Sequence, residues 1–501
     1  MDDRRGLTVP AARIEVRRLD SAPDLAVLAA ASTADLVWLD SALPDGAPAT
    51  ARPRARWSVL AWTDGPFASR FHHQDRRAHR TVAAPAAAWF GPTGSDDRPA
   101  FVALADLLAR TPHLPGPVPG CGFALGWVGF LGYELGRESG GPDRTADGHA
   151  DADLRFVDRA VVVDHTGGAW ALALVADAEP AASARNRAWL GTVPTSTASA
   201  DPGEVPPGLP DGAATARVSR AAYQDAVDAC RAEIREGNAF QVCLTTAFAV
   251  GQEARAGSGA DAHLLEYLRM RAADPVPFGA WLRLGPLRVA SRSPERFLRI
   301  DAAGTVLAEP IKGTRPRLVD PAVDAAVRDE LATSAKDRAE NVMIVDLLRN
   351  DLLRTALPGS VHVERLCDVE TYASVHQMVS TIGAVLPEGT SRADVVRAAF
   401  PPGSMTGAPK ISAMAIADRL EGAPRGVYSG AIGYFSASGA VDLSVVIRTL
   451  VTVLDDAGSV RSRTLGAGGA VTWSSVAADE ADEVETKTRS VLGSVGAVVS
   501  W

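Results

Sequence analysis

The stretch GVYSGAIGYFSASGAVDLSVVIRTLVTV, residues 426–453, is rich in β-branched and aromatic side chains and is interrupted by Ser-Gly pairs. This pattern is typical of successive strands joined by tight turns. Apolar runs predict further strands at residues 239–250, 279–300 and 305–311. Capped or highly charged segments predict helices at residues 219–238, 321–356 and 478–495. Because strands occur in runs between long helices, without regular strand–helix alternation, the sequence predicts an α+β fold.

The first half of the chain has the same mixture. Strands are predicted at residues 34–42, 56–63 and 155–177, and a helix is predicted at residues 100–111. The segment at 193–214 is rich in Pro, Gly, Ser, Thr and Ala, which is typical of a solvated linker. We therefore expect three parts: an N-terminal α+β region at 1–192, a flexible linker at 193–218 and a second domain at 219–501.

Composition excludes several classes of function. The chain has 501 residues with 51 Lys and Arg against 60 Asp and Glu, so its net charge of −9 offers no basic field for nucleic acid or an anionic membrane. Its four cysteines form no CxxC pair, which argues against a disulfide framework and a thiolate zinc site. The N-terminus lacks the apolar segment of a secretion signal, and no apolar run is long enough to span a membrane. These features predict a soluble cytoplasmic protein.

Lysine is rare in this sequence. Only four of the 51 cationic residues are lysines: Lys312, Lys336, Lys410 and Lys487. An ammonium group can lose its proton when it is buried, whereas a guanidinium group stays charged. Lys312 lies in AEPIKGTRPR (308–317) beside apolar neighbours, so desolvation could make it a neutral nucleophile. The alternative is an exposed lysine in a turn.

Two acidic pairs have helical spacing. Asp337 and Glu340 are three residues apart on one predicted helix, and Glu480 and Glu483 repeat the spacing on another. Residues three apart share one face of a helix. Two such faces set opposite one another would form an all-oxygen site suited to Mg²⁺. Two solvated helix faces are the alternative, and the spacing alone does not decide between them.

Other polar residues have two interpretations each. Glu295 follows a predicted strand and could serve as an acid or base, or form a plain salt bridge. Arg448 is a cation within an apolar strand and needs an anion, either from the protein or from a substrate carboxylate. His376 is either a core histidine or a catalytic one. The Gly-rich segments 401–410 and 465–470 could direct backbone N–H groups at an anion, but neither matches a nucleotide-binding fingerprint.

Together, these segments resemble the chorismate-utilising enzymes, in the branch of aminodeoxychorismate synthase component I and anthranilate synthase component I. The matching segments, in family order, are FQVCLTT, SRSPERFL, PIKGTRPR, DRAENVMIVDLLRNDL, FPPGSMTGAPK, YSGAIGYF, IRT, GAGGAVTW and EADEVETK. They span residues 219–501, while LVWLDSA and GFALGWVGFLGYELG (122–136) match the family's N-terminal segments more weakly. The resemblance implies a chorismate-binding fold, with a large two-layer antiparallel β-sandwich flanked by helices and with residues 219–501 as the catalytic domain.

The resemblance also implies roles for particular residues. By position, Glu340 and Glu483 correspond to ligands of Mg²⁺, the one cofactor implied, with Asp337 and Glu480 behind them. Asp337 replaces a glutamate that is common in relatives. The residues implied to bind chorismate or to lie beside it are Gln241, Thr406, Lys410, Tyr428, Arg448, Gly466 and Gly468. The residues implied to act in catalysis are Lys312, Glu295 and His376.

Two positions distinguish the reactions of the family. Isochorismate and salicylate synthases have a water-activating lysine where this chain has Gln241, so the resemblance implies that ammonia is the nucleophile. Anthranilate synthases usually have PIAGTR where this chain has PIKGTR, and the lysine marks aminodeoxychorismate synthases. The implied reaction is the amination of chorismate to 4-amino-4-deoxychorismate, a precursor of p-aminobenzoate for folate or an antibiotic. The alternatives are an anthranilate synthase component I, a 2-amino-2-deoxyisochorismate synthase and an inactive regulatory subunit.

The implied reaction needs a source of ammonia. A glutamine amidotransferase requires a cysteine nucleophile at a strand–helix elbow. No cysteine of the chain has this context; Cys121 in PGCGF comes closest, but it lies in the N-terminal part. The sequence therefore predicts that a separate glutamine amidotransferase subunit supplies ammonia.

Overall fold

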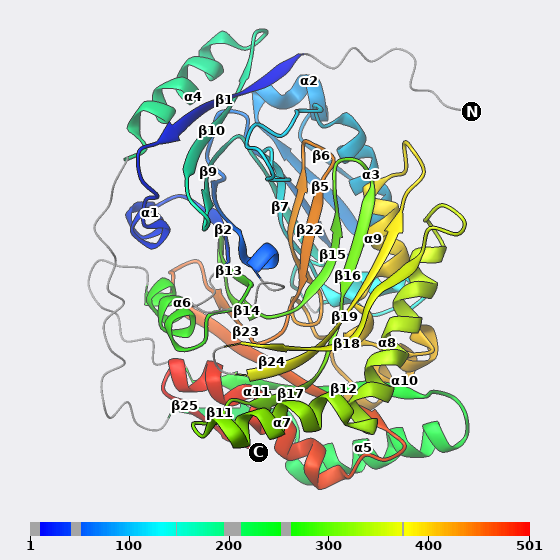
Figure 1. Ribbon diagram of the computed structural model, residues 1–501. Coiled ribbons are helices and arrows are strands. Elements are labelled where there is room, and N and C mark those ends of the chain that lie inside the picture. The colour runs from blue at the N-terminus through cyan, green and yellow to red at the C-terminus, as the bar shows by residue number, and fades with distance from the viewer. Residues whose placement is uncertain (1–10, 42–51, 147, 195–211, 252–261, 373–374) are drawn as a thin grey trace.

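Two large β-sheets, sheet A and sheet B, pack face to face in the computed structural model (Figure 1). The structure describes residues 11–41, 52–146, 148–194, 212–251, 262–372 and 375–501. Every strand pair in it is antiparallel except one in sheet A, so the expected α+β fold with two antiparallel layers is confirmed.

Sheet A has 13 strands. Twelve lie side by side in the order β1 (Ala12–Leu19), β10 (Ala169–Ala176), β9 (Arg159–Asp164), β3 (Trp57–Trp62), β2 (Leu36–Asp40), β13 (Phe278–Leu284), β14 (Leu287–Ser293), β23 (Thr449–Leu454), β24 (Val460–Thr472), β12 (Gln241–Val250), β11 (Gly212–Ala216) and β25 (Ala497–Ser500). The short β20 (Gly407–Ala408) pairs with the start of β12, and this brings the segment after residue 401 to the edge of the sheet.

Sheet B has 12 strands. Eleven follow the order β17 (Ile311–Pro316), β19 (Val375–Val385), β16 (Thr305–Glu309), β15 (Arg296–Ile300), β22 (Val441–Val445), β21 (Ala431–Ser436), β7 (Gly126–Leu131), β8 (Ala152–Val157), β4 (Ser69–Gln74), β5 (Arg77–Val82) and β6 (Gly94–Asp96). The remaining strand, β18 (His362–Thr371), pairs with β19.

Helices flank both sheets. Their bounds are α1 (Leu25–Ala31), α2 (Ala87–Phe90), α3 (Ala100–Arg110), α4 (Pro180–Thr192), α5 (Arg220–Arg235), α6 (Ala262–Ala273), α7 (Pro321–Thr333), α8 (Ala335–Leu353), α9 (Arg392–Ala399), α10 (Lys410–Glu421) and α11 (Ala477–Ser494). Ser334 separates α7 from α8, because its hydroxyl accepts a hydrogen bond from the Asp337 amide and begins a new helix. Within the described residues, no helix is long and apolar enough to cross a membrane.

Each sheet contains a block of strands from the first half of the chain joined edge to edge with a block from the second half. In sheet A, β2 pairs with β13 and places Trp38 opposite Trp281, and in sheet B β7 pairs with β21. Most of the predicted linker, residues 195–211, lies outside the described residues, but β11 falls within the interval 193–218 and pairs with β12 and β25. The division into domains stays a prediction, while the described strands show that the first half completes both sheets.

Two apolar cores hold these layers. One lies between the sheets and includes Val59 of sheet A with Phe71 and Trp127 of sheet B. The other lies between sheet A and helices α5, α6 and α11, where it includes Tyr267 and Val484. Helix α11 packs on β24 of sheet A, whereas α8 packs on β17 and β19 of sheet B. The two helices that carry the acidic pairs are therefore attached to different sheets.

Candidate active site

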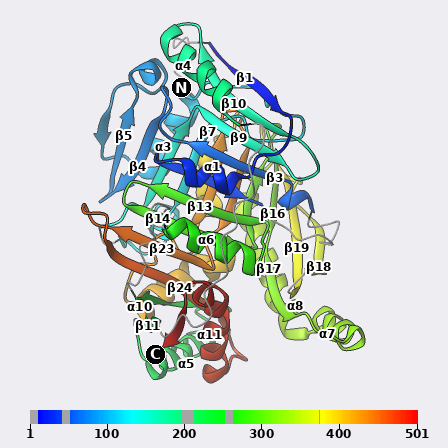
Figure 2. The ribbon, with the colours of Figure 1, turned by 90° about the vertical axis from the view of Figure 1, so that its left-hand side faces the viewer.

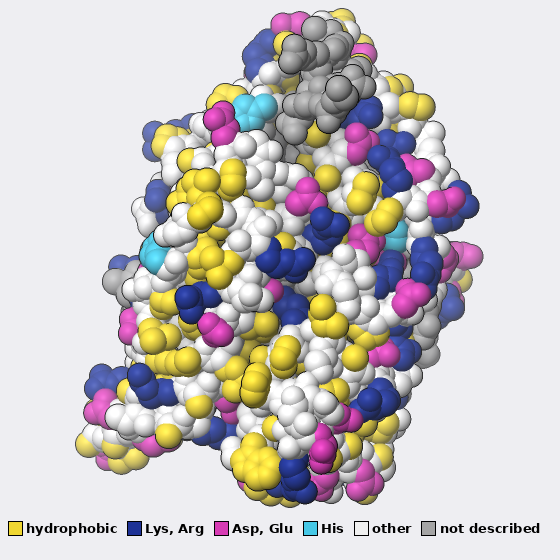
Figure 3. All heavy atoms as spheres, turned by 90° about the vertical axis from the view of Figure 1, so that its right-hand side faces the viewer, with side chains coloured by type: hydrophobic (Ala, Val, Ile, Leu, Met, Phe, Trp, Pro, Cys, Tyr) yellow, Lys and Arg dark blue, Asp and Glu magenta, His cyan; other side chains and the backbone are white. Residues whose placement is uncertain are grey.

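The helices that carry the acidic pairs, α8 and α11, lie at the lower end of the molecule in Figure 2. Figure 2 shows α7 and α8 on one side of this end and α5 and α11 on the other. Figure 3 views the molecule from the opposite side and shows the surface hollowed between a projecting lobe and the mass beside it. The predicted site residues come from both sides of this region and from the strand ends above it, so the folded chain brings distant motifs together.

Glu295 and Lys312 form the central pair of this site. Glu295 immediately precedes β15 and is 6% exposed, and Lys312 is the second residue of β17. Burial raises the pKa of Glu295 to about 7, although the positive charge of Lys312 opposes the rise. The Ile311 amide also donates a hydrogen bond to the Glu295 carboxyl group. A carboxylic acid with this pKa retains its proton for much of the time near neutral pH and can act as a general acid.

The Gly-rich segment around β20 closes one side of this pair. The Lys312 ammonium donates a long hydrogen bond of 3.5 Å to the Ser404 carbonyl oxygen. Thr406 is fully buried, and its carbonyl oxygen accepts a hydrogen bond from the Cys243 amide in β12. Gln241 begins β12 and is fully buried, and neither its amide oxygen nor its amide nitrogen has a partner among the described residues. The side chain of Gln241 is therefore available to a bound molecule.

Three carboxylates gather where α8 approaches α11. Burial raises the pKa of Glu340 and of Glu480, and the negative charge of Glu483 adds to each rise. Among the described residues, Glu340 Oε1 and Glu480 Oε2 are buried without a hydrogen-bond donor. Buried carboxylate oxygens without donors are costly unless a cation compensates them. This arrangement fits a divalent cation such as Mg²⁺.

Lysines partly neutralise these carboxylates. Lys487 donates to Glu483 Oε1 at 2.6 Å and to the Gly468 carbonyl oxygen at 2.8 Å, and the Lys336 nitrogen lies 4.0 Å from Glu340 Oε1. The described part of the chain forms no group of three or more His, Cys, Asp or Glu side chains placed to hold a metal together. A Mg²⁺ ion here would take few protein ligands and obtain the others from water or substrate, as this ion commonly does.

Tyr428 and the glycines of β24 form another wall. The Tyr428 ring packs against Gly466, where a Cβ would lie 2.3 Å from the ring. A Cβ at Gly468 would lie 2.4 Å from the Leu244 carbonyl oxygen, and one at Gly469 would lie 2.6 Å from Glu480 Oε2. Close approach by neighbouring groups therefore requires glycine at these three positions.

Three other predicted residues are held by protein partners. Asp337 forms an ion pair of 2.8 Å with Arg315. Both ring nitrogens of His376 are engaged, one by Asp324 and one by Thr371, and this joins β19 to α7 and β18. Direct contact of Asp337 and His376 with a metal or substrate stays a prediction.

Lys410, the third of these residues, is engaged by Asp351 and by the carbonyl oxygens of Ala399 and Pro401. It fastens the Gly-rich segment to α8.

Arg448 has fewer protein partners than Lys410. Its side chain is 23% exposed, and its closest recorded partner is Asp274 at 3.5 Å. Arg448 can therefore receive an anion.

A family model described as a chorismate binding enzyme matches residues 67–493. The chain belongs to the chorismate-binding enzyme family. It is 45% identical over 470 residues to the aminodeoxychorismate synthase of Streptomyces griseus, covering 91% of this chain and 60% of that protein. It is 40% identical over 350 residues to aminodeoxychorismate synthase component 1 of Salmonella typhimurium, covering 69% of this chain and 73% of that protein. The chain thus spans about three-fifths of the length of the Streptomyces relative.

A solved structure of the same family shares the architecture. The crystal structure of anthranilate synthase component I from Streptococcus pneumoniae superposes with a TM-score of 0.69 at 25% sequence identity. The superposition covers 87% of this chain and 92% of that chain. The expected chorismate-binding fold is therefore confirmed.

The sequence alone gave no indication of a role for Lys487 or Gly469 in this site. Lys487 lies four residues after Glu483, and this spacing on a helix could have indicated the ion pair. Gly469 lies within the quoted Gly-rich segment, but only the packing of Glu480 against it distinguishes it from its neighbours.

Proposed function

We propose that this chain aminates chorismate at C4 to give 4-amino-4-deoxychorismate, and that it is the chorismate-converting part of an aminodeoxychorismate synthase. The observation that carries the proposal is the position of Lys312 beside the buried, readily protonated Glu295. The names of the Streptomyces griseus and Salmonella relatives support the same reaction. The family match supports chorismate as the substrate.

The chain's own residues can perform the proposed chemistry. Glu295 protonates the 4-hydroxyl group, which leaves as water, while the Lys312 amine, after releasing a proton to solvent, forms a bond to C2 as the ring double bonds shift. Ammonia then attacks C4, the double bonds shift back, and the bond from Lys312 to C2 breaks to release the amine. A proton from the new amino group returns to Glu295, and the pyruvyl group is retained. Covalent catalysis divides one difficult displacement into two easier steps. The side-chain amide of Gln241 has no partner among the described residues, and an amide provides no base for activating water.

The remaining site residues bind and orient the substrate. Arg448 and the amides of Gly466 and Gly468 receive carboxylate oxygens, and Tyr428 covers the same wall. Thr406 shapes the pocket, while Lys410 fastens the segment that contains it. Glu340 and Glu483 are the proposed Mg²⁺ ligands, with Glu480 beside them and Asp337 outside. Bound Mg²⁺ would supply positive charge for the ring carboxylate of chorismate.

The ammonia is proposed to come from a separate glutamine amidotransferase. All four cysteines are buried, and burial raises the pKa of each thiol, to about 11 for Cys121 and about 12 for Cys230. Such thiols are poor nucleophiles, because the thiolate is the reactive form. The words "component 1" in the name of the Salmonella relative also support a second component.

The test is a direct product assay. Purified protein is incubated with chorismate, MgCl₂ and an ammonium salt, and the products are identified by mass spectrometry and fluorescence. The expected product is 4-amino-4-deoxychorismate, without release of pyruvate. Anthranilate with pyruvate would instead assign the chain to the anthranilate synthases, and absence of any amino product would reject the proposed function.

A further inference from the structure

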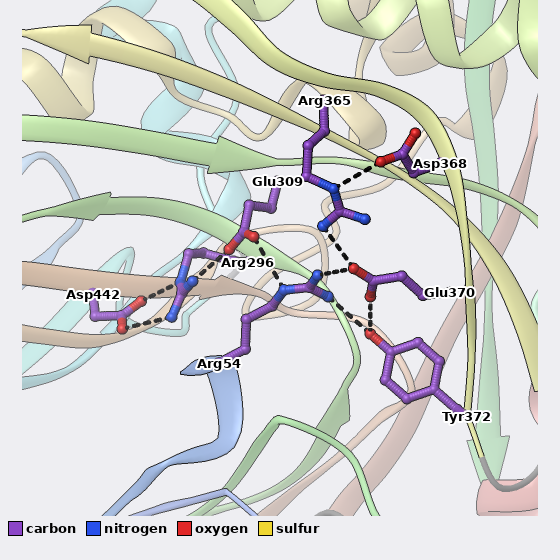
Figure 4. A network of polar contacts seen from close by, with 8 residues as sticks. All are labelled: Arg54, Arg296, Glu309, Arg365, Asp368, Glu370, Tyr372 and Asp442. Carbon is purple, nitrogen blue, oxygen red and sulfur yellow. Dashed lines mark hydrogen bonds and ion pairs between the residues drawn. The ribbon is translucent and has the colours of Figure 1, made fainter. Parts of the chain in front are cut away.

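A network of charged side chains joins Arg54 of the N-terminal half to β15, β16 and β18 (Figure 4). Its central cation is Arg54, which belongs to a short 3₁₀ helix at Arg52–Ala55 and has a side chain that is 3% exposed. Arg54 Nε lies 3.0 Å from Glu309 Oε1, and Nη2 lies 2.5 Å from Glu370 Oε1. Nη1 donates a hydrogen bond of 2.8 Å to the Tyr372 hydroxyl. One cation therefore links the end of β16 to the end of β18.

The network also reaches the residues beside the catalytic pair. Arg296 binds Glu309 Oε2 and forms two hydrogen bonds with the Asp442 carboxylate, at 3.0 and 3.2 Å. Arg296 directly follows Glu295, and Glu309 precedes Lys312 by three residues. Arg296 and Glu309 are also opposite one another in the β15–β16 ladder. Glu309 is thus held on one side by the neighbour of Glu295 and on the other by Arg54.

The charges of this network depend on one another. Burial alone would lower the pKa of Arg54, but the carboxylates of Glu309 and Glu370 raise it above its ordinary value. Burial opposes ionisation of Glu370, yet Arg54 lowers its pKa. Removal of Arg54 would leave Glu309 with Arg296 and Glu370 with Arg365, whose side chain is 25% exposed. The two carboxylates would then no longer be held together.

We propose that Arg54 is a positioning residue for catalysis: by bridging Glu309 and Glu370 it holds the β16–β17 segment so that Lys312 faces Glu295. The proposal rests on the proposed function for the roles of Lys312 and Glu295. It assigns to the N-terminal half of the chain a part in the geometry of the reaction. A planar guanidinium group can engage two carboxylates and a hydroxyl group at once, whereas the point charge of a lysine cannot reproduce this fork.

The kinetic test is a double-mutant cycle. Arg54→Met and Glu309→Gln are each expected to lower kcat with ammonium at least tenfold while changing the KM for chorismate less than twofold. If Arg54 acts through Glu309, the double variant is no slower than the slower single variant, because coupled residues are not additive. Arg54→Lys is expected to fold and to have a kcat between those of Arg54→Met and the original protein. It replaces Arg54→Met in the kinetic test if that variant does not fold.

The matched control is Arg137→Met. Arg137 is also a buried cation of the N-terminal half, and it lies 2.7 Å from Asp151 without touching β15, β16 or β17. This variant is expected to lose thermal stability but to keep its kcat per folded molecule. We compare the two variants at equal fractions of folded protein. If Arg54→Met loses no more kcat than Arg137→Met, the proposal is overturned.

A second readout does not need turnover. Labelling the ε-carbons of lysine with ¹³C gives at most four methylene signals, since the chain has only four lysines. Lys312→Arg assigns the Lys312 signal. Arg54→Met or Arg54→Lys is expected to shift this signal and to leave that of exposed Lys336 in place. Unshifted Lys312 signals in both variants would overturn the positioning role, whereas a shift in a protein that does not aminate chorismate would reject only the proposed function.

Discussion

The Tyr428 ring lies so close to Gly466 that a Cβ at this glycine would be 2.3 Å from the ring. Gly466→Ala must therefore displace the ring or the β24 backbone. Overpacking of this kind costs about 1–3 kcal/mol. We expect the KM for chorismate to rise at least tenfold, as measured by steady-state kinetics, together with a lower thermal midpoint. Gly191→Ala is the control, because a Cβ at Gly191 in α4 meets nothing within 4 Å. If both variants had the same KM for chorismate and the same thermal midpoint, the proposed contact of Tyr428 with Gly466 in the substrate site would be wrong.

The protonation of Glu295 predicts a pH dependence of the reaction. Its pKa of about 7 means that the acid form, which the proposed mechanism requires, disappears as pH rises through neutrality. We expect kcat to fall about tenfold for each pH unit above this point, and Glu295→Gln to lower kcat at least 100-fold. Rates measured with a constant concentration of neutral ammonia separate this effect from ionisation of ammonium. A flat profile between pH 6 and 9 would exclude Glu295 as the acid.

The same carboxyl group predicts a change in stability with pH. The folded state raises the pKa of Glu295 from 4.5 to about 7, so its protonated form stabilises the fold below pH 4.5 and this contribution is lost as pH rises through 7. At 1.36 kcal/mol per pKa unit, the loss is roughly 3 kcal/mol for this buried group. Glu295→Gln should therefore gain stability relative to the original protein between pH 5 and 8.5. Urea denaturation of both proteins at these two values measures the difference.

Glu340 and Glu483 predict that Mg²⁺ stabilises the protein. Glu340 Oε1 has no hydrogen-bond donor among the described residues, and the negative charge of Glu483 repels it. We expect Mg²⁺ to raise the thermal midpoint, Glu340→Gln to remove this rise, and a chelator to abolish turnover. Because burial raises the pKa of Glu340, protons should compete with the metal more strongly as pH falls. Asp346→Asn, an exposed site on the same helix, should keep the full rise; a loss there would point to a general charge effect.

Lys312 predicts a covalent adduct. Incubation with chorismate and Mg²⁺ in the absence of ammonia should add to the protein the mass of chorismate less one water molecule. Peptide mass spectrometry should find the addition on Lys312 and on none of the other three lysines. Lys312→Ala should lose the adduct and reduce kcat by about 10³-fold, which is a typical scale for loss of an activated nucleophile. Full activity of Lys312→Ala would favour an anthranilate-type reaction.

Local sequence was enough to predict most of the secondary structure. The predicted helix at residues 219–238 is α5, which Ser219 caps, and the predicted helix at 478–495 is α11. Residues 426–453 form β21, β22 and β23 as predicted. Capping, apolar periodicity and turn residues act over a few neighbouring positions, so they can be read without the fold. The ordered motifs likewise identified the family and the candidate site residues.

The partners of those residues depended on the tertiary structure. Spacing showed that each acidic pair shares a helix face, but only the packing of α8 on sheet B and α11 on sheet A brings the two faces together. Likewise, the sequence did not show that Asp351 engages Lys410 whereas Glu295 lies beside Lys312.

The role inferred for Arg54 had no signal in the sequence at all, since its partners Glu309 and Glu370 lie more than 250 residues away. The sequence by itself determined which segments become helices and strands and which family motifs are present. The tertiary structure decided which charges meet, because desolvation and ion pairing depend on the side chains that surround a group in space rather than along the chain.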